Sequence, residues 1–204
     1  MNLDIIFAIL IGYFLGSIPF ALVIGKLFYK TDIRLYGSHN LGGGNAGRVL
    51  GKKAGLSVMT CDLLKVTLAV FLVSLFSKDQ FALIAAGFSA AMGHCFPIFA
   101  KFKGGKAVAT MYGFLFGMAL IAGYSFWIFF VPLIAFLIVL YLWRIIALAS
   151  ILSAVVNTIF IFFVIDSIPL FVTSLIFTLI LIVRHHKNLE RMIHGTENKI
   201  KWMG

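Results

Sequence analysis

The sequence predicts an all-α integral membrane protein in which a single domain, residues 1–204, crosses the bilayer seven times. Its residues are 62% hydrophobic and only 12% charged, whereas soluble domains average roughly 45–50% apolar and 25% charged residues. Several stretches of about 20 residues carry no charge, and a helix needs that length to cross roughly 30 Å of hydrocarbon. The basic residues are concentrated in alternate loops. These three observations exclude a soluble protein.

Apolar segments account for the predicted spans in order. The first, residues 4–25, is too long for a cleavable signal sequence and has no charged segment before it, so we expect it to be retained. Residues 107–143 contain no charge and would reach on the order of 55 Å as one helix, so we divide them at Gly123-Tyr124-Ser125. The predicted spans are residues 4–25, 56–76, 80–100, 107–123, 126–143, 145–165 and 167–183.

Fifteen of the 17 lysines and arginines fall in three loops and the C-terminal tail, including Lys201, which alternating spans place on one side. Short cytoplasmic loops accumulate Lys and Arg, so we predict an outside N-terminus and a cytoplasmic C-terminus in the bacterial inner membrane. This topology explains the net charge of +10, which therefore does not indicate a nucleic-acid partner. Lys65 lies within a span and should pair with Asp62, in a structural or a functional role.

The first group of candidate binding residues is the glycine-rich segment, residues 37–48. Five glycines stand there beside Ser38, Asn40, Asn45 and Arg48. Glycines with positive φ let backbone N–H groups converge on an anion, and arginine adds a planar fork that matches phosphate oxygens. The segment predicts a phosphate cradle, although a flexible turn explains the same composition. Its spacing matches neither the ATP-binding nor the dinucleotide-binding glycine motif.

A second group joins two predicted spans and contains Gly93-His94, Lys101 and Gly104-Gly105-Lys106. A Gly-Gly-Lys sequence at a helix start brings free N–H groups, the positive end of the helix dipole and an ammonium to one point. This arrangement favours an anion, while lysines around a cytoplasmic glycine turn are an equal alternative. His94 by itself is typical of a hydrogen-bonded interior histidine.

A third group follows the last span. Helical continuation would place His185 and Asn188 three residues apart on one face, where lipid headgroups meet the cytosol. A basic amphipathic tail on anionic lipid is the alternative. The three groups are distant in sequence but share one predicted membrane face. Their joint occurrence predicts a substrate with a phosphate and a fatty tail.

These motifs together resemble the bacterial acyl-phosphate:glycerol-3-phosphate acyltransferase family, known as PlsY, over nearly the whole chain. The resemblance implies transfer of a fatty acyl group from acyl phosphate to the 1-position hydroxyl of glycerol 3-phosphate. The products would be lysophosphatidic acid and inorganic phosphate, in the first step of phospholipid synthesis. The matching motifs, in family order, are Gly16-Ser17-Ile18-Pro19 with Lys26, residues 37–48 with residues 50–55, Asp62 with Lys65, residues 93–106, and residues 184–188 with Gly195-Thr196-Glu197-Asn198.

The resemblance also implies roles for individual residues. Catalytic or orienting roles fall on Ser38, His185 and Asn188. Substrate binding falls on Arg48 and Lys106, with Lys101, Asn40 and Asn45 as further candidates. The chain departs from the family pattern at His39 and Ala107, where glycine is usual, at Gly43-Gly44, where Ala-Thr is common, and at Ala147, where a serine is common, which puts a contribution from Ser150 in doubt.

An acyl phosphate is already activated, so transfer in one step needs no covalent acyl-enzyme. The His-x4-Asp arrangement of another acyltransferase class is missing, and only His185 with Glu190 comes close. We therefore expect a substrate phosphate to accept the hydroxyl proton, with His185 as the alternative base. Cys61 and Cys95 form no metal or disulfide framework. We expect no metal or other cofactor, and no partners besides the two substrates and membrane lipid. A monomer would suffice.

Two other functions fit some of these features. A small transporter or channel for an organic phosphate would also use basic loops and polar spans. Transporters usually bind their substrate near the membrane midplane, but apart from Asp62 and Lys65 the predicted spans hold no charge in their interior. A membrane scaffold protein would not need Gly, Asn, His and Arg concentrated in separate loops.

Overall fold

The computed structural model describes residues 3–200, and within that range the chain is helical, without β-strands. It forms two compact units, Met1–Tyr124 and Ser125–Gly204. Lys201, predicted in the basic cytoplasmic tail, lies outside the described residues. The all-helical fold class is confirmed, whereas the single domain stays a prediction.

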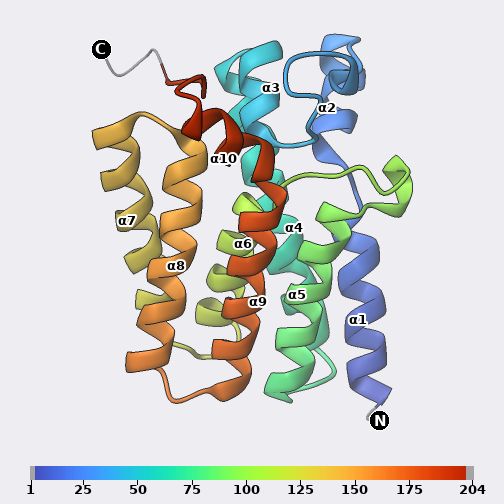
Figure 1. Ribbon diagram of the computed structural model, residues 1–204. Helices are drawn as coiled ribbons and strands as arrows, with labels where there is room; N and C mark the ends of the chain where they lie inside the picture. Colours follow the sequence, from blue (N-terminus) through green and yellow to red (C-terminus); the bar gives the residue numbers. More distant parts are fainter. Residues whose placement is uncertain (1–2, 201–204) are drawn as a thin grey trace. The chain divides into compact units, whose positions relative to one another are not determined.

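Helix α4 is the centre of the first unit, because it contacts each of that unit's other α-helices. Its 23 residues include eleven buried ones, among them the charged Asp62 and Lys65. The helices of this unit are α1 (Leu3–Gly16), α2 (Phe20–Tyr29), η1 (Ile33–Leu35), α3 (Gly43–Val49), α4 (Lys52–Ser74), α5 (Gln80–Cys95), η2 (Ile98–Ala100) and α6 (Val108–Leu120) (Figure 1).

The first predicted span, residues 4–25, is interrupted in the structure. Ser17-Ile18-Pro19 separates α1 from α2. Proline has no N–H for the helix ladder, its ring collides with the carbonyl four residues earlier, and it disfavours helical geometry at the preceding residue. The apolar run therefore forms two helical pieces, and the carbonyl of Ile18 becomes available to a side chain from elsewhere.

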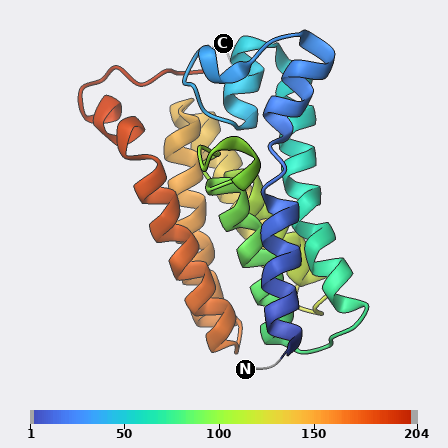
Figure 2. The same cartoon turned by 90° about the vertical axis from the view of Figure 1, so that its right-hand side faces the viewer.

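Helices α1 and α5 lie side by side and pack through small residues (Figure 2). A Cβ atom on Gly16 would collide with the carbonyl oxygen of Ala90, and one on Gly12 would collide with that of Ala86. Small residues let two helix backbones approach closely, which is how helices associate where no water drives them together. This contact fixes the end of α1, and thus the break after it, against α5.

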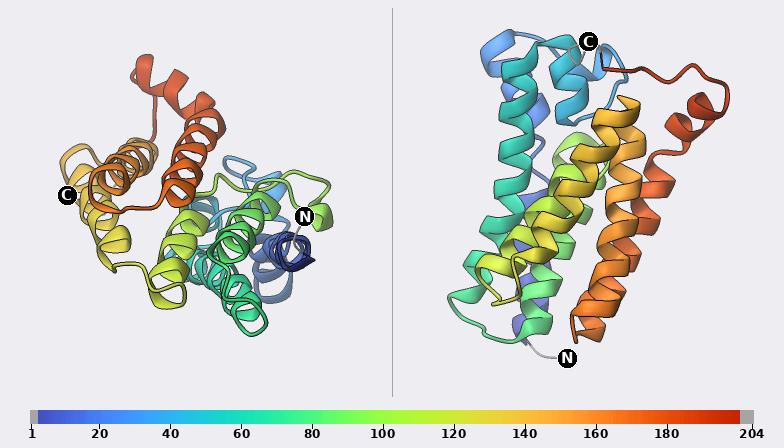
Figure 3. Two further views of the ribbon diagram at one scale, coloured as in Figure 1. Left: turned by 90° about the horizontal axis from the view of Figure 1, so that it is seen from below. Right: turned by 90° about the vertical axis from the view of Figure 1, so that its left-hand side faces the viewer.

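The second unit contains α7 (Trp127–Trp143), α8 (Ile146–Val164), α9 (Ile168–Arg184) and α10 (His186–Ile193). Helix α8 packs against both α7 and α9 (Figure 3). Between α8 and α9, the Thr158 hydroxyl lies 3.1 Å from that of Ser174 and 2.9 Å from that of Thr178. Hydrogen bonds of this kind join apolar helices in a membrane.

The lengths of the observed helices can be compared with the seven predicted spans. Of the described residues, four apolar helical segments are long enough to cross a membrane, or five if the bent pair α9–α10 counts as one. Helix α6 has 13 residues and α7 has 17, so both are shorter. The predicted turn at Gly123 is confirmed, because this residue has a φ of +80° between α6 and α7. Seven spans and their orientation stay predictions.

Candidate active site

The glycine-rich segment is half helical, although we predicted a loop with several positive-φ glycines. Of its glycines, only Gly37 has a positive φ, +61°. From Gly43 the chain forms α3, in which Gly43 and Gly47 pack against α4. A Cβ on Gly55 of α4 would lie 2.7 Å from the Cα of Gly47. Helix α3 is therefore seated tightly on α4, and Arg48 lies in its last turn.

Asn45 holds the loop that precedes α3. Its side-chain Oδ1 accepts a hydrogen bond of 2.8 Å from the N–H of Ser38, and its Nδ2 donates to the carbonyls of Ile33 and Tyr36 at 3.3 and 3.1 Å. Asn45 is 2% exposed. Because both ends of the amide bind backbone groups, the structure gives Asn45 a supporting role, in which it shapes the loop that presents Ser38.

His39 adopts the left-handed conformation, with a φ of +56°. This is the position where the family resemblance has glycine, and the left-handed region favours glycine because a Cβ is strained there. The ring Nδ1 lies 2.8 Å from the carbonyl oxygen of Arg34, to which it donates in the tautomer that carries a proton on Nδ1. That contact ties the strained residue back to the loop.

The loop before the glycine-rich segment contains an ion pair between Asp32 and Arg34. The guanidinium contacts both carboxylate oxygens, with Nη2–Oδ2 at 2.6 Å and Nε–Oδ1 at 2.9 Å. These hydrogen bonds lower the pKa of Asp32 to about 2, although burial acts in the opposite direction. The carboxylate in turn raises the pKa of Arg34. The pair is therefore charged at neutral pH and braces this turn.

The cationic candidates differ in exposure. Arg48 and Lys101 are exposed, whereas Lys106 is half-buried. Among residues 3–200, no carboxylate forms an ion pair with Arg48. Ser38 is exposed and Asn40 is half-buried. An exposed guanidinium without a carboxylate beside it is suited to bind a phosphate.

Both glycines of the Gly-Gly-Lys sequence are required by contacts with His94. The Gly105 N–H donates to the His94 carbonyl at 3.0 Å. A Cβ on Gly105 would collide with Nε2 of the His94 ring, and one on Gly104 would collide with the His94 carbonyl oxygen. The loop that carries Lys106 is thus seated on His94, and α6 begins at Val108 directly after it. The predicted helix start after Lys106 is confirmed.

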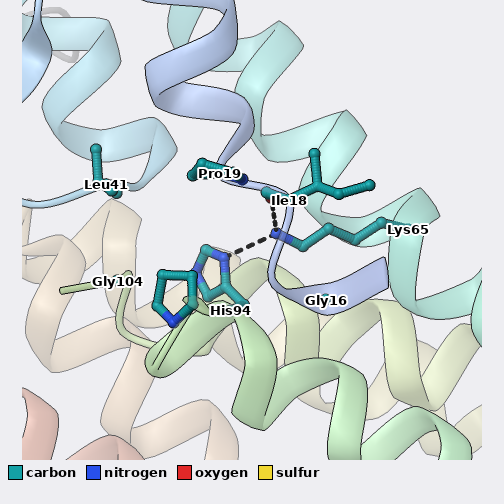
Figure 4. A pocket seen from close by; sticks show the side chains of 8 residues that line it. Gly16, Ile18, Pro19, Leu41, Lys65, His94 and Gly104 are labelled. Atoms are coloured by element: carbon teal, nitrogen blue, oxygen red, sulfur yellow. Dashed lines mark hydrogen bonds between the residues drawn. The ribbon is translucent and has the colours of Figure 1, made fainter. Parts of the chain in front are cut away.

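The predicted pairing of Asp62 with Lys65 is confirmed, and His94 joins the pair. Lys65 Nζ lies 2.7 Å from Asp62 Oδ1, 3.1 Å from His94 Nδ1 and 2.9 Å from the carbonyl oxygen of Ile18. The two charged side chains are each 2% exposed. Lys65 and His94 are among the residues that line a narrow recess (Figure 4).

That recess brings together two of the three predicted groups. Leu41 comes from the glycine-rich segment and Gly104 from the Lys106 loop, and both lie beside the break between α1 and α2. The lining residues are Gly16, Ile18, Pro19, Leu41, Lys65, His94, Pro97 and Gly104. Residues of the first two predicted groups therefore line the same recess, whereas a shared phosphate site stays a prediction.

In the second unit, the third group occurs at a bend. We predicted helical continuation of the last span, but α9 and α10 meet at an angle of 58° at His185. His185 and Asn188 are 3% and 7% exposed. His185 Nδ1 lies 2.8 Å from the Leu181 carbonyl oxygen, so Nδ1 carries the proton and the neutral ring keeps its lone pair on Nε2.

Glu197 belongs to a motif that the sequence analysis named without giving this residue a role. Its side chain is 4% exposed. Its two carboxylate oxygens accept hydrogen bonds of 2.7 Å from Asn188 Nδ2 and 2.6 Å from Arg191 Nε. The sequence feature that could have indicated this role is Gly195, because its φ of +68° returns the chain toward α10 and brings Glu197 beside that helix.

Ser150, whose contribution the sequence left in doubt, donates its hydroxyl to the Ile146 carbonyl of its own helix at 2.8 Å.

Comparisons with known proteins bear on the function. A family model described as glycerol-3-phosphate acyltransferase matches residues 6–195. A glycerol-3-phosphate acyltransferase of Geobacillus kaustophilus (strain HTA426) is 45% identical over 197 residues, which cover 96% of each chain. That of Streptococcus pyogenes serotype M5 (strain Manfredo) is 43% identical over 202 residues, covering 95% of this chain and 92% of that protein.

Two solved structures of a glycerol 3-phosphate acyltransferase are also similar to this chain. The crystal structure of PlsY (YgiH), an integral membrane glycerol 3-phosphate acyltransferase, in its glycerol 3-phosphate form is 32% identical, with a TM-score of 0.87. The lysophosphatidic acid form of PlsY is 31% identical, with a TM-score of 0.85. Each comparison covers 96% of this chain and 95% of the solved one. This chain belongs to the glycerol-3-phosphate acyltransferase family.

Proposed function

We propose that this protein transfers a fatty acyl group from acyl phosphate to the 1-position hydroxyl of glycerol 3-phosphate, giving lysophosphatidic acid and inorganic phosphate. Membership of the family supports the acceptor and the reaction type. The observation that carries the proposal furthest is the recess at which the glycine-rich segment and the Lys106 loop meet. Both segments carry the cations and backbone donors that a phosphorylated substrate needs.

Acyl phosphate is the donor that best suits these residues. Its carbonyl carbon is already activated by the phosphate that will leave, so the enzyme has to orient the acceptor hydroxyl and stabilise the leaving anion. Arg48 and Lys106 are assigned to substrate phosphate groups. The guanidinium of Arg48 offers two parallel donors to phosphate oxygens, whereas the Lys106 ammonium acts as a point charge. Lys101 and Asn40 are assigned to secondary phosphate contacts.

Orientation of the acceptor falls on Ser38, His185 and Asn188. The N–H of Ser38 donates to Asn45, which fixes the backbone that carries the Ser38 side chain. The neutral His185 ring has its lone pair on Nε2, so it can accept a hydrogen bond from a hydroxyl. The proton lost by that hydroxyl goes to a substrate phosphate, with His185 as the alternative acceptor. Asn188 has its amide orientation fixed by Glu197.

The proposed setting is the cytoplasmic face of the bacterial inner membrane. Seven spans with an outside N-terminus would place every candidate loop on that face, where a water-soluble acceptor and a membrane-embedded acyl chain can both arrive. The concentration of basic residues in the loops supports this topology. A monomer is sufficient for the proposed chemistry.

The proposal is tested with the purified full-length protein in detergent, given acyl phosphate and labelled glycerol 3-phosphate. We expect labelled lysophosphatidic acid to form, and to form equally in the presence of a metal chelator. Acyl-CoA and acyl carrier protein thioesters serve as alternative donors, and their use in place of acyl phosphate would overturn the donor assignment. Failure of every donor would refute the enzyme and favour a phosphate transporter, which needs a sealed vesicle to show its activity.

A further inference from the structure

Lys65 connects three distant parts of the first unit through one ammonium group. An ammonium has three N–H donors and no acceptor. Three acceptors lie within hydrogen-bond distance of Lys65 Nζ, namely Asp62 Oδ1 at 2.7 Å, the Ile18 carbonyl oxygen at 2.9 Å and His94 Nδ1 at 3.1 Å. Each donor therefore has one partner, and those partners come from α4, from the break after α1 and from the end of α5. Figure 4 shows the contacts with Ile18 and His94.

The contact with Lys65 requires one tautomer of His94. Because the ammonium can only donate, Nδ1 of the imidazole accepts in this hydrogen bond, and the neutral ring then carries its proton on Nε2. The same Nδ1 lies 3.4 Å from Asp62 Oδ1, to which it would donate if it carried a proton. The Nε2 edge of the ring faces Gly105, where a Cβ would collide with Nε2. The Gly105 N–H also donates to the His94 carbonyl at 3.0 Å. Lys65 thus holds one edge of the ring, and the opposite edge abuts the loop.

The loop has little freedom once His94 is fixed. Gly104 and Gly105 are buried, and Ala107 has a φ of +63° before α6 begins. Lys106 lies between these constrained residues. A rotation of the His94 ring would bring it against the backbone of Gly105, the residue that precedes Lys106.

A role in stability alone does not account for the third hydrogen bond of Lys65. The ion pair with Asp62 is nearly completely buried, and buried ion pairs often stabilise a fold no better than apolar residues of similar size. Their best-attested use is to specify one arrangement among several. Here the arrangement specified is that of His94 and the loop seated on it.

We propose that Lys65 is a positioning residue for acyl transfer. Through His94 it fixes Gly104 and Gly105, and thereby holds the Lys106 ammonium where a substrate phosphate binds. Asp62 balances the charge of Lys65 within the span. The proposal rests on the phosphate-binding role of Lys106 stated under the proposed function.

The test is a double-mutant cycle on the full chain with Lys65→Met and Lys106→Met, read as turnover at saturating substrates in monodisperse protein. We expect Lys65→Met alone to lower kcat by about tenfold or more, and Lys106→Met alone by about a hundredfold. In the Lys106→Met background, Lys65→Met should change the rate by less than about threefold, because residues that act through one group are not additive. Lys78→Met is the matched control, since Lys78 also donates to a backbone carbonyl, that of Ser74 at 2.8 Å.

The outcomes separate this proposal from the proposed function. If Lys106→Met keeps full turnover, the phosphate role of Lys106 fails, and the role of Lys65 fails with it. If Lys106→Met is inactive while Lys65→Met keeps kcat within about threefold of the parent, only the positioning role is overturned. An equal loss from Lys65→Met in both backgrounds would reduce Lys65 to a general structural residue, which also overturns the proposal.

Two further measurements cover the case in which the Lys65→Met variant does not fold because its buried Asp62 carboxylate has lost the paired ammonium. Asp62→Asn with Lys65→Met replaces the ion pair by a neutral pair of similar volume, and it should show the same loss of kcat. Nitrogen NMR of the unmutated protein labelled at histidine reports the His94 tautomer directly. We expect a proton on Nε2 and a bare Nδ1, and a proton on Nδ1 would contradict the proposed contact with Lys65.

Discussion

Ala107 occupies a backbone conformation that suits glycine better. Its φ is +63°, it is completely buried, and the family resemblance has glycine at this position. A left-handed residue with a Cβ costs roughly 1–2 kcal/mol relative to glycine, which is partly offset by the greater freedom of glycine in the unfolded chain. The chain therefore keeps a small local strain next to Lys106.

We expect Ala107→Gly to stabilise the protein by about 0.5–1 kcal/mol. The measurement is the thermal unfolding midpoint in detergent, compared between variant and parent. Ala122→Gly, in the α6–α7 loop at a position where φ is not positive, is the control and should lower the midpoint. A lower midpoint for Ala107→Gly as well would show that the strain is absent.

Glu197 orients Asn188, and its charge is needed because both of its partners are donors. In a Glu197→Gln variant, the new NH2 group would face the Nδ2 of Asn188 or the Nε of Arg191. We expect kcat to fall roughly tenfold, or about 1.4 kcal/mol of barrier, while the exposed Glu190→Gln control keeps parental activity. Unchanged turnover in the Glu197→Gln variant would show that its bond to Asn188 has no bearing on the reaction.

At the scale of elements, the seat of α3 on α4 depends on glycine. A Cβ on Gly55 would lie 2.7 Å from the Cα of Gly47 and 2.9 Å from its nitrogen. Both are backbone atoms that cannot rotate away. By contrast, a Cβ on Gly44 would meet nothing within 4 Å, and glycine within a helix costs roughly 0.5–1 kcal/mol relative to alanine.

These contacts predict opposite effects of the same substitution. Gly55→Ala should displace α3 with Arg48, lower the unfolding midpoint and reduce turnover by about tenfold or more. Gly44→Ala should leave turnover unchanged and raise the midpoint slightly. Thermal unfolding and turnover of the two variants, side by side, provide the measurement. Equal behaviour of both variants would mean that α3 does not rest on α4 as described.

Elements that depend on local composition could be predicted from the sequence, whereas elements that depend on tertiary contacts could not. Helices α4, α5 and α8 arise from long apolar runs, which composition alone identifies. Helix α3 was missed because glycine disfavours helices, and contacts with α4 override that preference. The interruption of α1 was readable from Ile18-Pro19, but hydrophobicity counts an apolar proline as part of a span. The bend at His185 leaves no comparable mark in the sequence.

In the candidate site, too, local contacts could be predicted from the sequence and long-range contacts could not. Lys65 and Asp62 are three residues apart, so their pairing follows from helical geometry. The contact of Lys65 with Ile18 spans 47 residues, and no local pattern encodes it. Glu197 reaches Asn188 only because Gly195 reverses the chain. Residue types that bind phosphate can thus be selected from sequence, whereas the residues that orient them depend on tertiary contacts.

At the scale of the whole molecule, the testable feature is its orientation in the membrane. Charge asymmetry predicts that Lys78 lies outside and Lys187 in the cytoplasm. In a Cys61→Ala and Cys95→Ala background, an impermeant maleimide added to intact cells should label a Lys78→Cys variant and spare a Lys187→Cys variant. The reverse pattern would invert the topology, and labelling of both variants would contradict an odd number of spans between the two positions.

The bond between Lys65 and Ile18 has a consequence for biogenesis. When the first apolar segment leaves the ribosome, its interrupted backbone presents the Ile18 carbonyl. This oxygen accepts a hydrogen bond of 3.1 Å from the N–H of Phe20 within the segment, and its second hydrogen bond, from Lys65, needs a later helix. Lys65 reaches the bilayer already paired with Asp62 of its own helix, which offsets the cost of a cation there. The hydrogen bond between Lys65 and Ile18 can therefore form only after α4 has been inserted. An insertase would have to protect the partly packed intermediate until both segments have been synthesised.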